Sequence, residues 1–130
     1  MSDRYRRGVD IAQLLSSGSL DKFLTSRVAE VAPDFARMAI EFPFGDLYAR
    51  DGLDLKTREI VAITALATLG HSDQLRLHVA AALDHGLERR AVVEILMQSA
   101  IYGGFPKALN ALADCHDLLT DDDCVGGSCG

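Results

Sequence analysis

The central part of the chain constrains the fold most: residues 60–69 are apolar apart from two threonines. This stretch is about half as long as the roughly 20 residues that a bilayer-spanning helix needs, so it suits a helix buried on most of its circumference. A second helical pattern covers residues 72–85, after a turn of two or three residues. So short a turn forces the two helices to lie side by side and antiparallel. We therefore expect a helical hairpin at the centre of the molecule.

The rest of the chain also predicts helices, because Ala and Leu favour helix and no sustained apolar–polar alternation predicts a strand. Glycines at 70, 86 and 103–104 stand where helices are expected to stop. Further helices are expected over residues 3–15, 19–31, 33–42, 88–102 and 105–119. Residues 43–46 are expected to kink or interrupt the chain before a short segment, 47–50. The prediction is an all-α, single-domain protein of about six to seven helices over residues 1–119. Residues 120–130 are acidic and Gly-rich, and we expect a disordered tail there.

Composition limits the classes of partner. The chain has 130 residues and a formal net charge of −6, which gives no electrostatic footprint for a phosphate backbone and argues against a nucleic acid partner. The first residues are polar and charged, with no apolar segment typical of a signal peptide. We expect a cytoplasmic protein that does not bind membranes.

The hairpin carries a candidate catalytic pair, His78 and Glu59. His78 shares a helix face with Leu75 and Ala82, so its imidazole is expected to be partly buried and to need a hydrogen-bond partner. Glu59 lies 11 residues before Gly70 and His78 lies 8 after it, a mismatch of about 4.5 Å along the hairpin that a Glu side chain can cover. Imidazole suits proton transfer near neutral pH. The alternatives are a structural histidine and a first-turn Glu favoured by the helix dipole.

Four more polar or aromatic residues are candidate substrate-binding residues. His71 lies in the hairpin turn, where it either faces the same cavity or is simply exposed, and the polar Gln74 lies just inside the next helix. Arg58 occupies a first helical turn, which is unfavourable for a cation, so a carboxylate partner or a solvated side chain is expected. Tyr102 precedes a Gly-Gly helix break that either lines a pocket, fits a partner subunit or is a plain turn.

Cysteine and cofactor motifs give little support to redox or metal chemistry. Cys115, Cys124 and Cys129 form no Cys-x-x-Cys pair, and two of them fall in the tail. Together with His116 they match no common zinc-ligand spacing. No P-loop, Rossmann glycine fingerprint, H-E-x-x-H or G-x-S-x-G motif is present. We expect neither a metal nor a cofactor.

Several segments resemble the carboxymuconolactone decarboxylase family of the alkylhydroperoxidase-D-like superfamily. The later segments are the more specific, because the His and the Gln-Ser-Ala-Ile-Tyr run fall at the family's order and spacing. The similar residues are Arg4, Tyr5, Gly8, the run 44–48 with Arg50, Thr57, Arg58, the run 75–78 with Ala81 and Ala82, and the run 97–102 with Gly104 and Pro106. The resemblance covers roughly residues 4 to 119.

The resemblance implies an alkylhydroperoxidase-D-like helical bundle that assembles as a homo-oligomer, often a trimer or hexamer. It also implies a pocket near the Glu-to-His helix pair that a neighbouring subunit helps to complete. Glu59 and His78 match the Glu and His of the peroxidase branch, whereas His71 and Gln74 stand where its two cysteines would be. The missing cysteines favour the decarboxylase branch, although Glu59 is not typical of that branch.

Three hypotheses follow from these patterns. The first is a cofactor-independent decarboxylase, or a related isomerase, acting on a small carboxylated lactone or cyclic acid such as 4-carboxymuconolactone. In this hypothesis His78 is the proton donor and Glu59 orients it or relays the proton. Arg58 or His71 binds the carboxylate of the substrate. The second is a thiol peroxidase, suggested by superfamily membership and needing the tail cysteines. The third is a non-enzymatic oligomeric binding protein.

Overall fold

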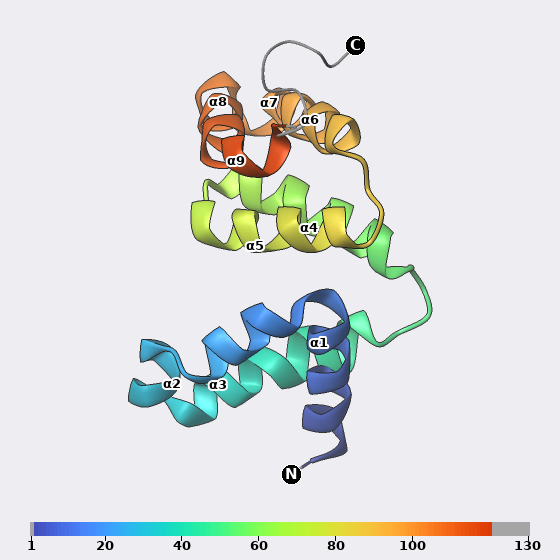
Figure 1. Ribbon diagram of the computed structural model, residues 1–130, viewed down its shortest axis with the longest axis vertical. Helices are drawn as coiled ribbons and strands as arrows, with labels where there is room; N and C mark the ends of the chain where they lie inside the picture. The colour runs from blue at the N-terminus through green and yellow to red at the C-terminus, as the bar shows by residue number, and fades with distance from the viewer. Residues whose placement is uncertain (1, 121–130) are drawn as a thin grey trace. The chain divides into compact units, whose positions relative to one another are not determined.

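The computed structural model describes residues 2–120, except for the side chain of Ser17. These residues are helical with no strand among them, which confirms the all-α prediction (Figure 1). The chain forms two compact units, one ending at Arg58 and one beginning at Glu59. We call them unit 1 and unit 2 and describe each by itself. The predicted tail, residues 120–130, lies almost wholly outside the described part of the chain, and the single domain over residues 1–119 stays a prediction.

Unit 1 contains the helices that precede the boundary between the two units, and this boundary falls within the next helix, α4. They are α1 (Asp3–Leu24), α2 (Arg27–Val31), α3 (Pro33–Ile40) and the π-helix η1 (Glu41–Tyr48). The predicted stop at residues 16–18 appears as a single non-helical residue, Ser16, with φ −164° and ψ 97° inside α1. The helix expected over 19–31 is interrupted at Ser26, whose hydroxyl caps α2 by accepting from the Ala29 amide. A serine N-cap favours a new helix start at this point.

Pro43 does not end the helix, so of the two alternatives predicted for residues 43–46, a kink or an interruption, the interruption is not found. Pro43 lies within η1, which continues directly from α3. Proline has no N–H to donate and its ring crowds the carbonyl of the preceding turn, so an α-helix is strained there. The wider π-helical turn, with its bond from the Ala49 amide to the Phe44 carbonyl at 3.1 Å, carries the chain past the proline.

Close backbone approach joins α1 to η1. A Cβ placed on Gly45 would overlap the main-chain oxygen of Arg4, and one placed on Gly8 would overlap that of Ile40. Both positions therefore need the absence of a side chain. Around this contact lies a small apolar cluster formed by Ala12, Leu20, Ile40, Tyr5, Val9, Phe23 and Phe44.

Unit 2 contains most of α4 and all later helices. The helices are α4 (Leu55–Leu69), α5 (Ser72–Asp84), α6 (Arg89–Gln98), α7 (Ala100–Gly103), α8 (Phe105–Asp114) and α9 (His116–Leu119). Three glycines with positive φ, Gly70 (79°), Gly86 (93°) and Gly104 (95°), stand at the predicted stops. The helices expected over 88–102 and 105–119 are each split, at Ser99 and at Cys115. These splits raise the number of segments without changing the fold class.

The α4–α5 hairpin contributes to the main apolar core of unit 2, on which α6, α8 and the residue before α9 also pack (Figure 1). The buried residues of this core are Ile63, Ala67, Leu75, Val79, Ala82, Val92, Leu96, Ala111 and Cys115. Among residues 2–120 no helix is long and apolar enough to cross a membrane. Within the apolar stretch of α4, Ile63 and Ala67 are buried in this core, whereas Val61 and Leu69 are more than half exposed.

Candidate active site

The predicted pair of Glu59 and His78 is formed. Glu59 lies in the second turn of α4 and His78 in the middle of α5, and Nδ1 of His78 lies 2.7 Å from Oε2 of Glu59. The short turn at Gly70 sets the register of the hairpin, and the Glu side chain covers the remaining mismatch between the two helices. The spacing argument therefore predicted this contact correctly, while the chemical roles of the two residues remain predictions.

Glu59 is the only charged residue among the buried side chains of the described chain, at 0% exposure, and the His78 side chain is 21% exposed. One carboxylate oxygen, Oε1, is buried and has no hydrogen-bond partner among the described residues. A buried carboxylate with a single partner is costly for stability. Such an arrangement is typical of a functional site.

The hydrogen bond also determines how the imidazole presents itself. A carboxylate only accepts, so Nδ1 of His78 carries the proton in this bond. The other ring nitrogen, Nε2, is left without a partner in the described part of the chain. It is therefore the nitrogen that can give a proton to a bound molecule or take one from it.

The structure does not bring the other predicted residues of unit 2 into this pair. His71 and Gln74 are exposed, and Tyr102 is 69% exposed. His71 supplies a backbone carbonyl to the Leu75 amide at the start of α5. Within residues 2–120 none of the three side chains hydrogen bonds to Glu59 or His78. Their predicted role in binding a substrate stays a prediction.

Arg58 belongs to unit 1 and contacts a carbonyl and an aromatic ring there. Its Nη2 donates to the main-chain oxygen of Arg50 at 3.2 Å, and its guanidinium lies 5.9 Å from the centroid of the Tyr48 ring. Its Nε is buried without a partner. No carboxylate of the described residues pairs with it, so the expectation of a carboxylate partner is not met within this part of the chain.

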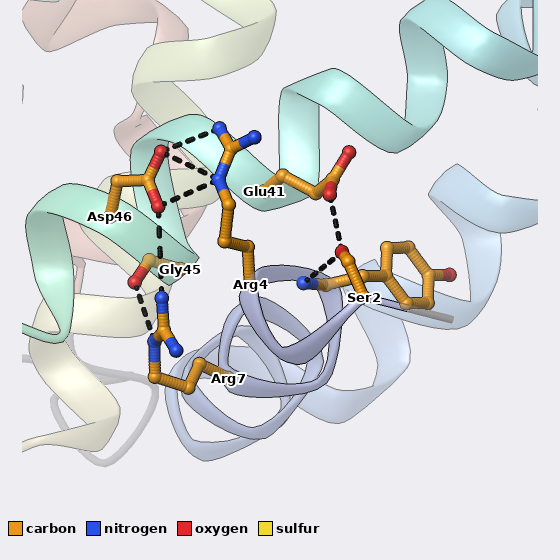
Figure 2. Close-up of polar contacts among 7 residues, drawn as sticks. Ser2, Arg4, Arg7, Glu41, Gly45 and Asp46 are labelled. Carbon is orange, nitrogen blue, oxygen red and sulfur yellow. Dashed lines mark hydrogen bonds and ion pairs between the residues drawn. The ribbon is translucent and has the colours of Figure 1, made fainter.

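An ion-pair network in unit 1 was not predicted as a network (Figure 2). Nε and Nη2 of Arg4 donate to the Asp46 carboxylate at 2.6–3.1 Å, and Arg7 donates to the Gly45 carbonyl at 3.2 Å. The hydrogen bonds from Arg4 hold the pKa of Asp46 below its usual range. The only sequence signal was the resemblance of Arg4, Gly45 and Asp46 to the family. The network joins α1 to η1 beside the glycine contact.

A second unpredicted network fixes the C-terminal helices of unit 2. Arg76 donates to both oxygens of Asp117, at 2.6 and 2.9 Å, and to the main-chain oxygen of Asp114 at 2.5 Å. The bonds from Arg76 lower the pKa of Asp117 to about 2. The partners are 38 and 41 residues apart, and no local pattern in the sequence signals such a pair. Both arginine networks join helices within one unit, which indicates a structural role.

The one cysteine among the described residues, Cys115, lacks the surroundings of a reactive thiol. Cys115 is completely buried in the core of unit 2, and this burial raises the pKa of its thiol. A peroxidatic cysteine needs the opposite environment, accessible and with a lowered pKa. Cys124 and Cys129 lie outside the described residues, as does part of the zinc set that they would form with Cys115 and His116.

A shallow cavity of about 200 Å³ lies at the turn end of the α4–α5 hairpin. On α4 its lining begins at Leu66, seven residues after Glu59, which is about 10 Å of helix rise. On α5 it ends at Leu75, one turn before His78. Neither member of the Glu59–His78 pair lines it, so this cavity is a separate feature.

The fold and the pair define a class: an all-helical protein with a buried Glu–His pair across a helical hairpin. Comparison with known proteins identifies the family. Residues 33–113, more than half of the chain, match the model of the Carboxymuconolactone decarboxylase family. The chain belongs to this family.

Curated relatives agree with this assignment. The 4-carboxymuconolactone decarboxylase of Acinetobacter baylyi is 26% identical over 119 residues, covering 91% of this chain and 88% of the relative. An uncharacterized 15.0 kDa protein of Paracoccus denitrificans is 30% identical over 122 residues, covering 85% and 91%. Nitrosuccinic acid decarboxylase of Metarhizium robertsii is 25% identical over 81 residues, covering 62% and 57%. Two of these three relatives are named as decarboxylases, which supports a decarboxylase-like activity.

Proposed function

We propose that the protein is a cofactor-independent decarboxylase, or a closely related lyase or isomerase, acting on a small carboxylated lactone or cyclic acid. Family membership and the names of two relatives support the reaction class. The observation that carries the proposal in this chain is the contact of 2.7 Å between the buried Glu59 carboxylate and the His78 ring. A substrate like 4-carboxymuconolactone is the first to test because one relative carries that name.

The reaction needs two things from a protein. When the bond between the carboxyl carbon and the adjacent ring carbon breaks, carbon dioxide leaves and the bonding electron pair is delocalised into a conjugated carbonyl as an enolate. Protonation of a carbon of this conjugated system then completes the reaction. A positioned acid for this proton and a polar group that stabilises the enolate oxygen are therefore the main requirements.

His78 is suited to deliver the proton. When its ring carries protons on both nitrogens, Nδ1–H donates to Glu59 and Nε2–H is free to protonate the substrate carbon. Water returns the proton to Nε2 before the next turnover. Glu59 acts as the positioning residue, since its carboxylate orients the ring and stabilises the positive charge. Arg58, His71, Gln74 and Tyr102 remain the predicted substrate-binding residues.

The test is carbon dioxide release from 4-carboxymuconolactone by the purified protein, with His78→Gln beside it. Loss of a general acid lowers turnover by a factor of about 10²–10⁴. His116→Gln is the matched control, because His116 is an exposed histidine in α9 of the same unit. Full turnover by a folded His78→Gln variant would exclude the role of His78. No release by the folded wild-type protein would exclude this substrate, and a panel of related carboxylated lactones then tests the reaction class.

We further propose that the protein works as a homo-oligomer, a trimer or hexamer. Large apolar side chains on α6, α7 and α8 are more than half exposed in the single chain, and so many neighbouring ones mark an interaction surface. They are Met97, Ile101, Tyr102, Phe105 and Leu109. A second copy is the occupant that the family resemblance implies. Light scattering of the wild type and of Ile101→Glu tests this: a monomeric wild type contradicts the proposal, and an oligomer that Ile101→Glu dissociates supports it.

A further inference from the structure

The cavity at the turn end of the α4–α5 hairpin combines an apolar floor with polar groups at its rim. Its floor is formed by Leu66, Ala67, Leu75 and Ala111, of which Ala67, Leu75 and Ala111 are buried. Its volume is about 200 Å³. Apolar floors with a few placed polar groups are the usual construction of a small-molecule site.

The lining of the cavity carries opposite charges at two positions of α8. Lys107 and Asp114 both line the cavity from α8, seven residues apart, which corresponds to about 10.5 Å of helix rise. Positions i and i+7 share a helix face, so both side chains stand on the same wall. Asn110 and Ala111 lie between them on that wall.

Asp114 and Lys107 differ in the hydrogen bonds that they already make within the protein. Oδ2 of Asp114 accepts from the Ser72 hydroxyl at 2.7 Å, which fixes the carboxylate at the rim and leaves its second oxygen available. Lys107 and the Asn110 amide make no hydrogen bond or ion pair within the described chain. The rim thus offers an oriented acceptor at one end and unused donors at the other.

We propose that this cavity binds a short linear aliphatic molecule with a carboxylate at one end and an ammonium group at the other. The carboxylate accepts from Lys107 and Asn110, the ammonium group donates to Asp114, and the methylenes cover the floor at Leu66 and Leu75. A chain of about five methylenes spans most of the distance between the two ends. A ligand with only one charge would leave the opposite rim charge without a partner and would bind less tightly.

Binding here does not depend on the proposed decarboxylase activity, since neither Glu59 nor His78 lines the cavity. The test is therefore a binding measurement on the full chain. 6-Aminohexanoate is titrated against the ¹⁵N-labelled protein, and the shifts of α8 amide signals are followed. A ligand of this size is expected to bind with a Kd of about 1 mM. Hexanoate and hexylamine, which each lack one charged end, are expected to bind roughly fivefold more weakly.

Two variants remove one rim charge each. Lys107→Gln should weaken the binding of 6-aminohexanoate roughly fivefold and leave the binding of hexylamine unchanged. Asp114→Asn should also weaken the binding of 6-aminohexanoate roughly fivefold, but leave the binding of hexanoate unchanged. Asparagine keeps an oxygen that accepts from Ser72, so the second variant preserves that contact. Lys22→Gln, which removes one lysine from unit 1, is the control for net charge.

The proposal is overturned if no α8 signal shifts in the presence of tens of millimolar 6-aminohexanoate. It is also overturned if hexanoate binds as well as 6-aminohexanoate, because the Asp114 end would then have no role. An equal loss of binding in Lys22→Gln would show a nonspecific charge effect and overturn it as well. Circular dichroism of each variant establishes that the helices are intact before its binding is compared.

Discussion

Unit 1 and unit 2 achieve internal stability by different means. In unit 1 the apolar cluster is small, and α1 meets η1 where Gly8 and Gly45 allow backbones to touch. The Arg4–Asp46 ion pair beside that contact is partly exposed. In unit 2 a continuous core includes Leu96 and Val79 at 0% exposure. The packing of unit 1 therefore depends on the absence of side chains at Gly8 and Gly45, whereas the packing of unit 2 depends on the volume of its buried side chains.

The difference bears on where chemistry can be placed. A buried carboxylate with an unpartnered oxygen, such as Glu59, is destabilising by itself. Unit 2 can contain it because the large core around the hairpin supplies compensating apolar burial. Four substitutions test this comparison, in order of decreasing expected effect on stability.

Leu96→Ala should have the largest effect. Leu96 is completely buried in the core of unit 2, and truncating such a leucine costs about 3 kcal/mol or more of unfolding free energy. Urea denaturation gives the total, and hydrogen exchange of α5 and α6 amides locates the loss in unit 2. Leu77→Ala, at a leucine that is 43% exposed in α5, is the control. Equal losses for the two variants would contradict the assignment of the core.

Gly45→Ala should come second. The added Cβ overlaps the Arg4 main-chain oxygen, and a backbone atom cannot move aside as a flexible side chain can. Overpacking of this kind costs about 2 kcal/mol. Hydrogen exchange should show faster opening in α1 and η1. At Gly52 a Cβ would meet no atom within 4 Å, so Gly52→Ala is the matched control, and a Gly45→Ala protein as stable as that control would refute the close contact.

Glu59→Leu should change stability little and activity greatly. Replacing the buried carboxylate by an apolar side chain removes its desolvation cost but leaves Nδ1–H of the partly buried His78 without its acceptor, so we expect the two effects to offset each other to within about 1 kcal/mol. Carbon dioxide release should fall by about 10²-fold, because His78 loses its orienting partner. Glu59→Gln, which keeps the shape and one acceptor, should retain more turnover than Glu59→Leu. A strongly destabilised protein with normal turnover would show that Glu59 is structural.

Asp117→Asn should have the smallest effect, and one that depends on pH. The bonds from Arg76 lower the pKa of Asp117 from 3.8 to about 2. A carboxyl group whose pKa is lowered by folding stabilises the folded state above its unfolded pKa, and this stabilisation is lost as the pH falls from about 4 through about 2. The variant should therefore differ from wild type at pH 6 and converge with it near pH 2. Urea titrations at both values measure this, with Asp84→Asn as the surface control; a constant difference would exclude the linkage.

Features set by local chemistry were predictable from the sequence. Gly70, Gly86 and Gly104 mark helix ends because a positive φ is easily adopted only by glycine. The approach of Glu59 to His78 followed from helix rise and a short turn, which together determine the register of a hairpin. Both inferences need only neighbouring residues and fixed helical geometry.

Features that depend on distant partners were not predictable. The bonds from Arg4 to Asp46 and from Arg76 to Asp117 join residues about 40 positions apart, and their helical patterns look like ordinary exposed faces. The π-helix was also missed, because Pro43 predicts a kink or an interruption and no local pattern indicates that the helical turn widens there. The roles of His71, Gln74, Arg58 and Tyr102 depend on a substrate, which neither spacing nor periodicity identifies.

The burial of Cys115 makes its thiol a probe of how often the core of unit 2 opens. A thiolate attacks a disulfide reagent only where the two can meet, and the core position of Cys115 blocks access and raises the pKa of its thiol. In a Cys124→Ser, Cys129→Ser background, the labelling rate of Cys115 thus counts how often the core of unit 2 opens in an otherwise native sample. At low reagent concentration the labelling rate of Cys115 depends on the equilibrium constant for opening of the core. At high reagent concentration it equals the rate constant for opening, so one side chain reports both quantities.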